Sequence, residues 1–182
     1  AQALPATKPR ASGSLFERLD PAATGIDFVN PVQKDHPLKH LYASAMGCGG
    51  VAVGDVDGDG KPDLFFSGGA RPNALYRQTG DLKFEDITEK ANVAAKVVWA
   101  TGASMIDIDN DGDLDIYVCN FDTPNHLFIN DGNGVFTEKA KEFGLNFVGP
   151  GHTPAFCDYD NDGDLDLYLM SNFYYDPRGK SE

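Results

Sequence analysis

The chain has 182 residues, 41% of them hydrophobic, which is enough length and apolar content for one globular domain with its own core. Its formal net charge is −13, from 28 acidic and 15 basic residues. This charge argues against nucleic acid and anionic membrane surfaces as partners, because both would repel the chain.

The N-terminal part differs in composition from the rest. Residues 1–14 are small or proline-rich and carry Lys8 and Arg10, so we expect a flexible leader behind a removed signal peptide. Residues 15–30 predict the outer strand of a preceding repeat, because Leu15–Leu19 resembles strand segments that recur later. No run of about 18 apolar residues occurs, so no membrane-spanning helix is expected.

A nine-residue pattern with aspartate at positions 1, 3, 5 and 9 and glycine at position 6 occurs three times. The copies, called loops 1, 2 and 3, cover residues 55–63, 107–115 and 158–166, and their starts lie 52 and 51 residues apart. Short apolar segments flank each loop, at 50–54 and 64–66, at 103–106 and 116–119, and at 153–157 and 167–170. Since these segments are rich in β-branched and aromatic residues, each loop is predicted to join two strands.

Two further segments recur after loops 1 and 2. Residues 73–77 match residues 125–129, and residues 84–88 match residues 136–140. Between them lie residues 79–81 and 130–134, which contain Gly, Asn and Asp and are able to close hairpins through positive φ angles. Each period is therefore predicted to contain four short strands.

Four strands in about 50 residues at constant spacing are typical of β-propeller blades, because one such sheet buries both faces only against neighbouring sheets. We therefore predict an all-β fold, a partial β-propeller over residues 15–182. Its blades are expected around 41–93, 94–145 and 146–182. Three incomplete blades do not close a ring, so we expect the remainder of a longer protein or partner subunits to cover the ends.

The loops are candidate calcium sites. Carboxylates at positions 1, 3 and 5 are expected to converge, position 7 to offer its backbone carbonyl, and position 9 to close the shell. Crowded carboxylates need solvent or a cation to compensate them, and a shell of hard oxygen ligands suits calcium. We expect about three Ca²⁺ ions, with ligands from Asp55, Asp57, Asp59, Lys61, Asp63, Asp107, Asp109, Asp111, Asp113, Asp115, Asp158, Asp160, Asp162, Asp164 and Asp166.

Loop 1 departs from the other two at position 7. Lys61 places a cation there, and we expect its carbonyl to be the ligand while its side chain points to solvent. Pro62 also stiffens this turn.

Two other interpretations of the loops are weighed. An EF-hand shares the opening of the pattern but needs a glutamate at position 12 between two helices. Position 12 is Phe66, Val118 or Leu169 here, so an EF-hand is disfavoured. The other interpretation is a solvated acidic turn without an ion, and three copies at one period argue against it.

The cysteines and histidines predict no catalytic or redox site. Cys48, Cys119 and Cys157 form no CxxC or CxxCH motif, and we interpret them as buried structural cysteines. A Cys119–Cys157 disulfide is left open. The four histidines are scattered, and we interpret them as surface or hydrogen-bonded core residues.

Several aromatic residues are interpreted as packing between blades rather than as a sugar-binding platform: Trp99, Tyr117, Tyr168 and residues 173–175. Residues 172–175 are also the best candidate for a partner contact, because the strands that would cover them are missing.

These motifs resemble the FG-GAP or VCBS repeat, the calcium-loop propeller blade also present in integrin α-subunits. The nine-residue loops, the Asn-x-Leu-aromatic segments at Asn73 and Asn125, the stretch 84–88 and the opening 25–28 carry the resemblance. The variety is similar to bacterial secreted proteins with an ASPIC/UnbV domain, of the cartilage acidic protein-like type. The resemblance implies a propeller of about seven blades, calcium in the hairpin loops, an extracytoplasmic location and a role in adhesion or assembly. The chain departs from that family in having no ASPIC/UnbV segment and too few blades.

Three functions follow from these observations. The first is a non-enzymatic, extracytoplasmic calcium-binding scaffold that contacts other protein chains. The second is an accessory subunit of a larger extracytoplasmic complex, including the case of a complex with redox cofactors. The third is a carbohydrate-binding or hydrolytic propeller, which a filled calcium shell disfavours because it leaves no free base.

Overall fold

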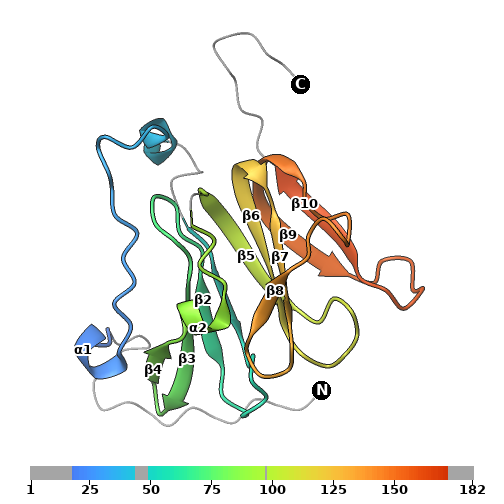
Figure 1. Ribbon diagram of the computed structural model, residues 1–182, viewed down its shortest axis with the longest axis horizontal. Coiled ribbons are helices and arrows are strands. Elements are labelled where there is room, and N and C mark those ends of the chain that lie inside the picture. The colour runs from blue at the N-terminus through green and yellow to red at the C-terminus, as the bar shows by residue number, and fades with distance from the viewer. Residues whose placement is uncertain (1–17, 44–48, 97, 172–182) are drawn as a thin grey trace, which may run out of the picture.

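The computed structural model describes residues 18–43, 49–96 and 98–171 (Figure 1). Strands dominate the described part and pair antiparallel, which confirms the predicted all-β class. The leader predicted at 1–14 and the aromatic cluster at 172–175 lie outside the described residues. The helical elements are α1 (Pro21–Thr24), a 3₁₀ helix (Lys39–Ala43) and α2 (Thr88–Ala91), and the strands are β1 (Val51–Gly54), β2 (Asp63–Phe66), β3 (Ala74–Gly80), β4 (Lys83–Asp86), β5 (Ala100–Ile106), β6 (Asp115–Pro124), β7 (His126–Asn130), β8 (Phe136–Glu138), β9 (Val148–Cys157) and β10 (Asp166–Ser171).

Each loop joins two strands of a hairpin, as predicted. The last residue of each loop pairs with the residue before its first aspartate: Gly54 with Asp63, Ile106 with Asp115, and Cys157 with Asp166. In the first sheet the order is β1-β2-β3-β4, and in the second β5, β6, β7 and β8 pair in sequence. The described residues thus contain two repeats of four strands each and the β9–β10 hairpin of a third repeat, arranged as one four-stranded and one six-stranded sheet.

The first strands of the three repeats are neighbours, β1 beside β5 and β5 beside β9, while β4 and β10 lie on opposite sides of the molecule (Figure 1). Glycine permits this approach. A Cβ atom on Gly102 would lie 2.0 Å from the carbonyl oxygen of His152, and one on Gly50 would lie 2.9 Å from the Cα of Gly102. Sheets that meet along their first strands form the wedge arrangement of a propeller.

Strand β6 is the centre of the core because it is covered on both faces. Its side chains alternate, as the period of a strand requires. Ile116 and Val118 belong to a cluster with Phe65 and Leu75 of the first sheet. Tyr117 and Cys119 belong to a second cluster, against which Phe156, Leu167 and Leu169 of the third hairpin pack. The repeats therefore bury their apolar residues between neighbouring sheets.

The second and third repeats are also joined through their backbones, which the sequence did not predict. We expected a strand over 116–119, but β6 continues to Pro124, and its end pairs with β9 at Phe121–Pro150 and Pro124–Val148. The hydroxyl of Thr101 on β5 reinforces this junction by donating to the carbonyl of Gly151 at 2.7 Å. β9 and β10 therefore extend the sheet of the second repeat.

Two predicted strands need correction. In segment 15–30, the described residues 18–30 contain no strand; Asp20 caps α1 by accepting from the backbone N–H of Ala22, and Pro21 begins the helix. The strand predicted over 84–88 ends at Asp86, whose carboxylate accepts from the N–H of Thr88 at 2.9 Å. α2 then begins at Thr88.

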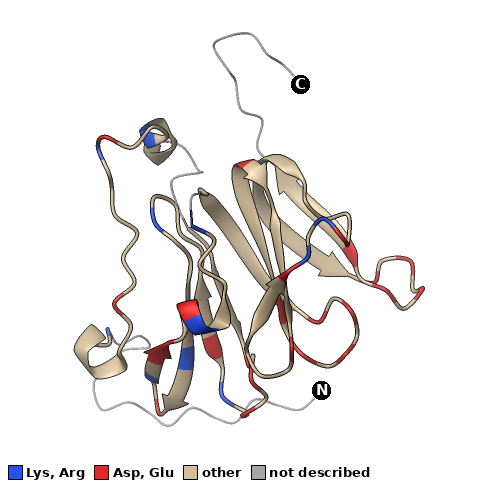
Figure 2. Ribbon diagram, viewed as in Figure 1, with Lys and Arg blue, Asp and Glu red and all other residues tan. Residues whose placement is uncertain are grey.

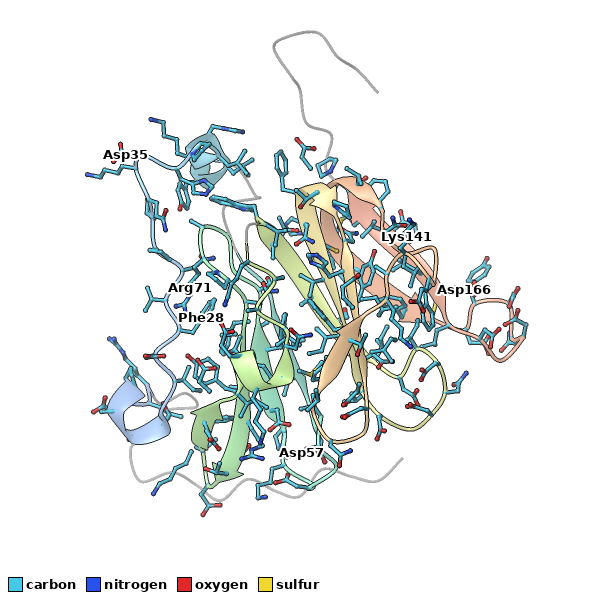
Figure 3. The ribbon with its side chains drawn as sticks, viewed as in Figure 1. Phe28, Asp35, Asp57, Arg71, Lys141 and Asp166 are labelled. Carbon is cyan, nitrogen blue, oxygen red and sulfur yellow. The ribbon has the colours of Figure 1, made fainter. Side chains whose placement is uncertain are left out.

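The segment after α1 covers the open face of the first sheet. The ring of Phe28 stacks on that of Phe66 with centroids 4.9 Å apart. The guanidinium carbon of Arg71 lies 4.3 Å from the centroid of the Phe28 ring (Figure 3). Nearby, the hydroxyl of Tyr76 donates to Asp27 at 2.7 Å. This segment thus occupies part of the face that a preceding blade would cover.

The predictions for cysteines and aromatic residues hold in part. Cys119 is a buried free thiol as expected, whereas Cys157 is free but exposed, so no disulfide joins them. Trp99 and Tyr117 are buried, but the side chain of Tyr168 is 76% exposed, because β10 has no described neighbour on that face. None of the described helices has the length and apolar character to cross a membrane.

Candidate metal sites

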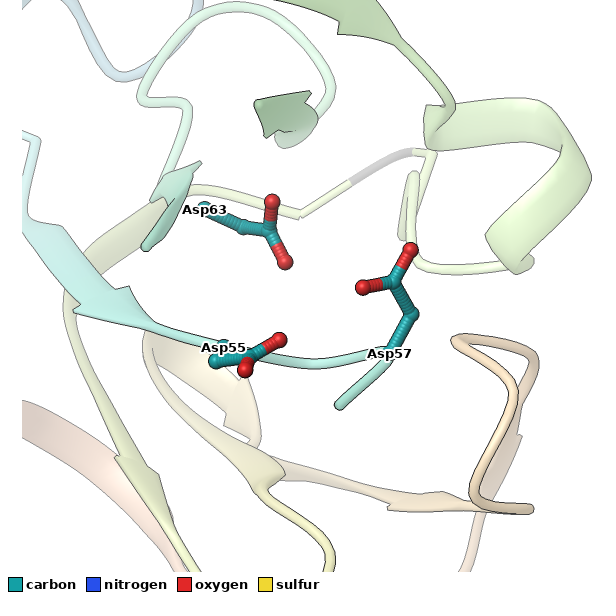
Figure 4. A group of neighbouring side chains, drawn as sticks. All are labelled: Asp55, Asp57 and Asp63. Atoms are coloured by element: carbon teal, nitrogen blue, oxygen red, sulfur yellow. The ribbon is translucent and has the colours of Figure 1, made fainter. Parts of the chain in front are cut away.

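In each loop the carboxylates of positions 1, 3 and 9 converge. One ligand oxygen from each of the three aspartates lies within 4.8 Å of the other two. Figure 4 shows this for loop 1, where the carboxylates of Asp55, Asp57 and Asp63 turn toward a common centre. The corresponding groups are Asp107, Asp109 and Asp115 in loop 2, and Asp158, Asp160 and Asp166 in loop 3.

Backbone hydrogen bonds fold each loop around its first aspartate. The carboxylate of Asp107 accepts from the N–H groups of Asp111 and Gly112, both at 3.1 Å. Asp55 and Asp158 accept from the same two positions of their own loops. The glycine at position 6 has φ between 83° and 98° in the three loops, which explains why the pattern requires glycine there.

Position 4 is a structural requirement that we did not predict. Gly58, Asn110 and Asn161 all have positive φ, from 59° to 70°. The sequence signal was present, since glycine and asparagine are the residues that best tolerate this conformation.

The aspartate at position 9 is the most buried ligand candidate in loops 1 and 2. Asp115 is 1% exposed, and its two oxygens accept from the N–H groups of Ile108 at 3.0 Å and Asn130 at 2.8 Å. Burial raises its pKa to about 6, although these hydrogen bonds act in the opposite direction. Asp63 is equivalently held by Val56 and Gln78, and burial raises its pKa too.

Asp166, at position 9 of loop 3, is exposed. Its carboxylate accepts from the N–H of Tyr159 at 2.9 Å, which matches the bond from Ile108 in loop 2.

The carboxylates at position 5 have other partners. Asp59, Asp111 and Asp162 each accept from the N–H of position 7, at 2.9 to 3.0 Å. In loop 1 the ammonium of Lys61 also pairs with Asp59, and this hydrogen bond lowers the pKa of Asp59. The ammonium of Lys61 therefore turns toward the loop, while its side chain stays 40% exposed.

The loops differ in how much positive charge the protein itself provides. Loop 1 has Lys61 beside Asp59, and Arg77 lies 3.7 Å from Asp57. Among the described residues, no lysine or arginine forms an ion pair with a carboxylate of loop 2 or loop 3. Figure 2 shows acidic residues along these loops at the lower and right-hand edge of the molecule.

The donor set fits calcium. The converging atoms are all carboxylate oxygens, and neither histidine nor cysteine belongs to the three groups. Hard oxygen ligands are those that Ca²⁺ prefers, and a divalent cation would offset the cost of holding a buried carboxylate beside two others. The flanking elements are strands in all three cases, so the loops are not EF-hands.

The asparagines that recur at equivalent positions of the first two repeats, Asn73 and Asn125, are structural residues whose role we did not predict. Asn125 is buried, accepts from the N–H of Asn120 at 2.8 Å and donates to the hydroxyl of Tyr117 at 2.8 Å. Asn73 accepts from Gly68 and donates to the carbonyl of Val93 in the first repeat. Both therefore fix the connection between the second and third strands.

His126 also has a structural environment, as expected for an isolated histidine. Its Nδ1 lies 3.0 Å from the side-chain nitrogen of Asn120, and burial lowers its pKa.

Comparisons with known proteins agree with the repeat pattern. The FG-GAP-like repeat matches at residues 55–118 and again at residues 107–169. Cartilage acidic protein 1 of Xenopus tropicalis is 28% identical over 131 residues, covering 70% of this chain, and the human protein is 32% identical over 132 residues, covering 66%. The chain spans about a fifth of the length of these relatives, 20% in each.

Proposed function

Because the chain belongs to the FG-GAP-like repeat family, we propose that it is a calcium-stabilised part of a β-propeller that serves outside the cytoplasm as a protein-interaction scaffold. In this proposal each loop binds one Ca²⁺ ion, and all the aspartates of the loops, with the carbonyl of Lys61, are available as its ligands. The ions are structural, and the chain performs no catalysis.

One observation carries the proposal. Three carboxylates converge in each loop, and in loop 2 the carboxylate of Asp115 is almost fully buried with no ion pair from the described residues. Carboxylates so arranged repel one another strongly in a medium of low dielectric. A bound divalent cation removes this repulsion and joins the two strands of the hairpin.

The extracytoplasmic location and the scaffold role rest on the same reasoning. Extracellular calcium modules work with dissociation constants of about 0.1–1 mM, a concentration that the cytosol does not reach. Propeller sheets hold loops of variable sequence on a rigid frame, which suits them to binding other proteins. The chain spans only 20% of the relatives named above, so the scaffold role is proposed for this part of the propeller alone.

The test is thermal and chemical unfolding with calcium and with excess chelator. We expect calcium to raise the midpoint, with about 2.7 kcal/mol of added stability per site when calcium is one hundred times the dissociation constant. Elemental analysis after equilibrium dialysis against calcium-containing buffer should find calcium in excess of the buffer concentration. An unchanged midpoint together with no bound metal would disprove structural calcium.

A matched pair of variants separates the loops from general charge effects. The triple variant Asp57→Asn, Asp109→Asn and Asp160→Asn removes position 3 from all three loops and should abolish the response to calcium. Asp81→Asn removes an exposed aspartate from the turn after β3 and should leave the response intact.

A further inference from the structure

Asn130 connects the ligand aspartates of loops 1 and 2. It lies at the end of β7 and is 5% exposed. Its side-chain NH₂ donates to the carbonyl of Val56 in loop 1 at 2.8 Å and to the carbonyl of Leu114 in loop 2 at 3.0 Å. One side chain of the second repeat therefore holds backbone groups of two neighbouring loops.

The same residues contact the ligand carboxylates directly. The N–H of Val56 donates to Asp63 at 3.0 Å, and the N–H of Asn130 donates to Asp115 at 2.8 Å. A continuous path of hydrogen bonds thus runs from Asp63 through Val56 and Asn130 to Asp115. Each link is buried, and buried hydrogen bonds resist rearrangement because an unpaired group is costly there.

The side chain of Asn130 has no spare hydrogen-bonding capacity. Its Oδ1 accepts from the N–H groups of Gly132 at 3.2 Å and Gly134 at 3.1 Å, while both amide hydrogens serve the two loops. A shift of either loop must therefore move the turn at 130–134 or break one of these bonds.

We propose that loops 1 and 2 bind calcium cooperatively and that Asn130 is the positioning residue that couples them. This inference rests on the proposed calcium function and deepens it. An ion in one loop fixes its position 9 aspartate, and the path through Asn130 then holds the backbone of the other loop in its ligand-bound arrangement. The second ion binds more tightly because less of the loop remains to be ordered.

The structure offers two internal comparisons. Gln78 occupies the equivalent position in the first repeat, because its N–H donates to Asp63 at 2.8 Å. Among the described residues, however, its side chain bonds only to Gly80 in its own turn. Loops 2 and 3 are joined in the described part by a longer contact between exposed groups, from Asn110 to the carbonyl of Gly163 at 3.4 Å. Neither arrangement links two buried position 9 aspartates.

The experiment is calorimetric titration of the chain with calcium alone. Asp160→Asn disables loop 3 and leaves loops 1 and 2; adding Asp57→Asn or Asp109→Asn leaves one of them. We expect the second ion of the two-loop variant to bind about fivefold more tightly than either single loop predicts. The variant Asp109→Asn, which keeps loops 1 and 3, should give the sum of two independent sites.

Asn130→Asp tests the assignment to this residue. Aspartate keeps the size and the acceptor of the Asn130 side chain, and the backbone N–H still donates to Asp115. It has no side-chain N–H to donate to the two carbonyls, so the fivefold difference should vanish. Gln78→Ala should preserve it. A second readout needs no calcium in loop 1. In the double variant Asp57→Asn, Asp160→Asn only loop 2 is left to bind calcium, and we expect added calcium to slow the amide hydrogen exchange of residues 55–63.

The outcomes are distinct. Independent binding by loops 1 and 2 would overturn the coupling and leave the calcium function standing, whereas a chain that binds no calcium overturns both. If Asn130→Asp does not fold, the titrations of the loop variants still decide whether loops 1 and 2 are coupled, and Asn130→Ala, which adds no charge, decides whether Asn130 couples them. Cooperative binding that survives in a folded Asn130→Asp variant would remove Asn130 from its role.

Discussion

Loops 2 and 3 have the same residues at eight of nine positions, yet the structure places them in different surroundings. They differ only at position 2, Ile108 against Tyr159. In loop 2 the position 9 aspartate is buried beneath β7 and accepts two backbone hydrogen bonds. In loop 3 the equivalent Asp166 is exposed and accepts one from the described residues.

The comparison shows that the loop sequence determines the fold of the turn, while the neighbouring strands determine its burial. Both loops make the same bonds from positions 5 and 6 to the first aspartate, at 3.1 to 3.2 Å. Of these two loops, only loop 2 has a described third strand, β7, beside it, and this strand brings Asn130 against Asp115. The same nine residues therefore acquire different electrostatic environments.

The largest expected contrast concerns the cysteines beside the two loops. Cys119 on β6 is buried, which raises its pKa to about 12, whereas Cys157, immediately before loop 3, is exposed. Since the thiolate is the reactive form, Cys157 should react with a thiol reagent about a thousandfold faster. Mass spectrometry of labelled peptides from a Cys48→Ser variant measures both rates. Equal rates would mean that the second repeat opens as readily as the third.

Truncation of the residue that follows each loop should give the next largest difference. Ile116 is fully buried between two sheets, and its counterpart Leu167 is only partly buried. We expect Ile116→Ala to cost about 3 kcal/mol of unfolding free energy and Leu167→Ala about 1 kcal/mol. Urea unfolding in chelator compares the two without any contribution from the ions. A larger loss from Leu167→Ala would contradict the described packing of β10.

Removal of the position 9 aspartates should separate the loops by a smaller amount. In saturating calcium, Asp115→Ala leaves the buried N–H of Asn130 and the part-buried N–H of Ile108 without an acceptor, which should cost about 2 kcal/mol beyond the lost ligand. Asp166→Ala leaves one exposed N–H that water can satisfy, so the extra cost should be under about 0.5 kcal/mol. Chemical denaturation at several calcium concentrations separates ligand loss from the lost hydrogen bonds.

The smallest effect is expected from making the two loops identical. Tyr159 is 83% exposed, so Tyr159→Ile should change stability by less than about 0.5 kcal/mol. Calcium affinity of loop 3, measured with loops 1 and 2 disabled, should also change little. If this one substitution gave loop 3 the properties of loop 2, the difference between them would lie in sequence rather than in surroundings.

The hairpins and loops were predictable because their determinants are local. Alternating apolar residues, glycine at position 6 and the fixed spacing of aspartates each act within a few residues, and β1, β2, β5, β9 and β10 were located from them. The wedge of sheets followed from the repeat period. These features need no knowledge of distant contacts.

The rest depends on residues that meet only in the folded chain. Asn130 was predicted as a turn residue, and nothing local announces that its side chain reaches Val56, 74 positions earlier. The extension of β6 to Pro124 depends on β9 arriving beside it, and the exposure of Tyr168 depends on what lies next to β10. The ion pair between Lys61 and Asp59 was not predicted either, because charge pairing within a loop depends on side-chain conformation.

Strand β6 pairs with β5 and β7, which are close to it in sequence, and also with β9, which lies farther along the chain. Its partners β5 and β7 are reached through short connections, so the second sheet closes with little loss of chain entropy. Its tail, residues 121–124, then offers an edge that is already rigid when β9 arrives. The second repeat would thus template the entry strand of the third, so that β9 is added to a sheet that has already formed.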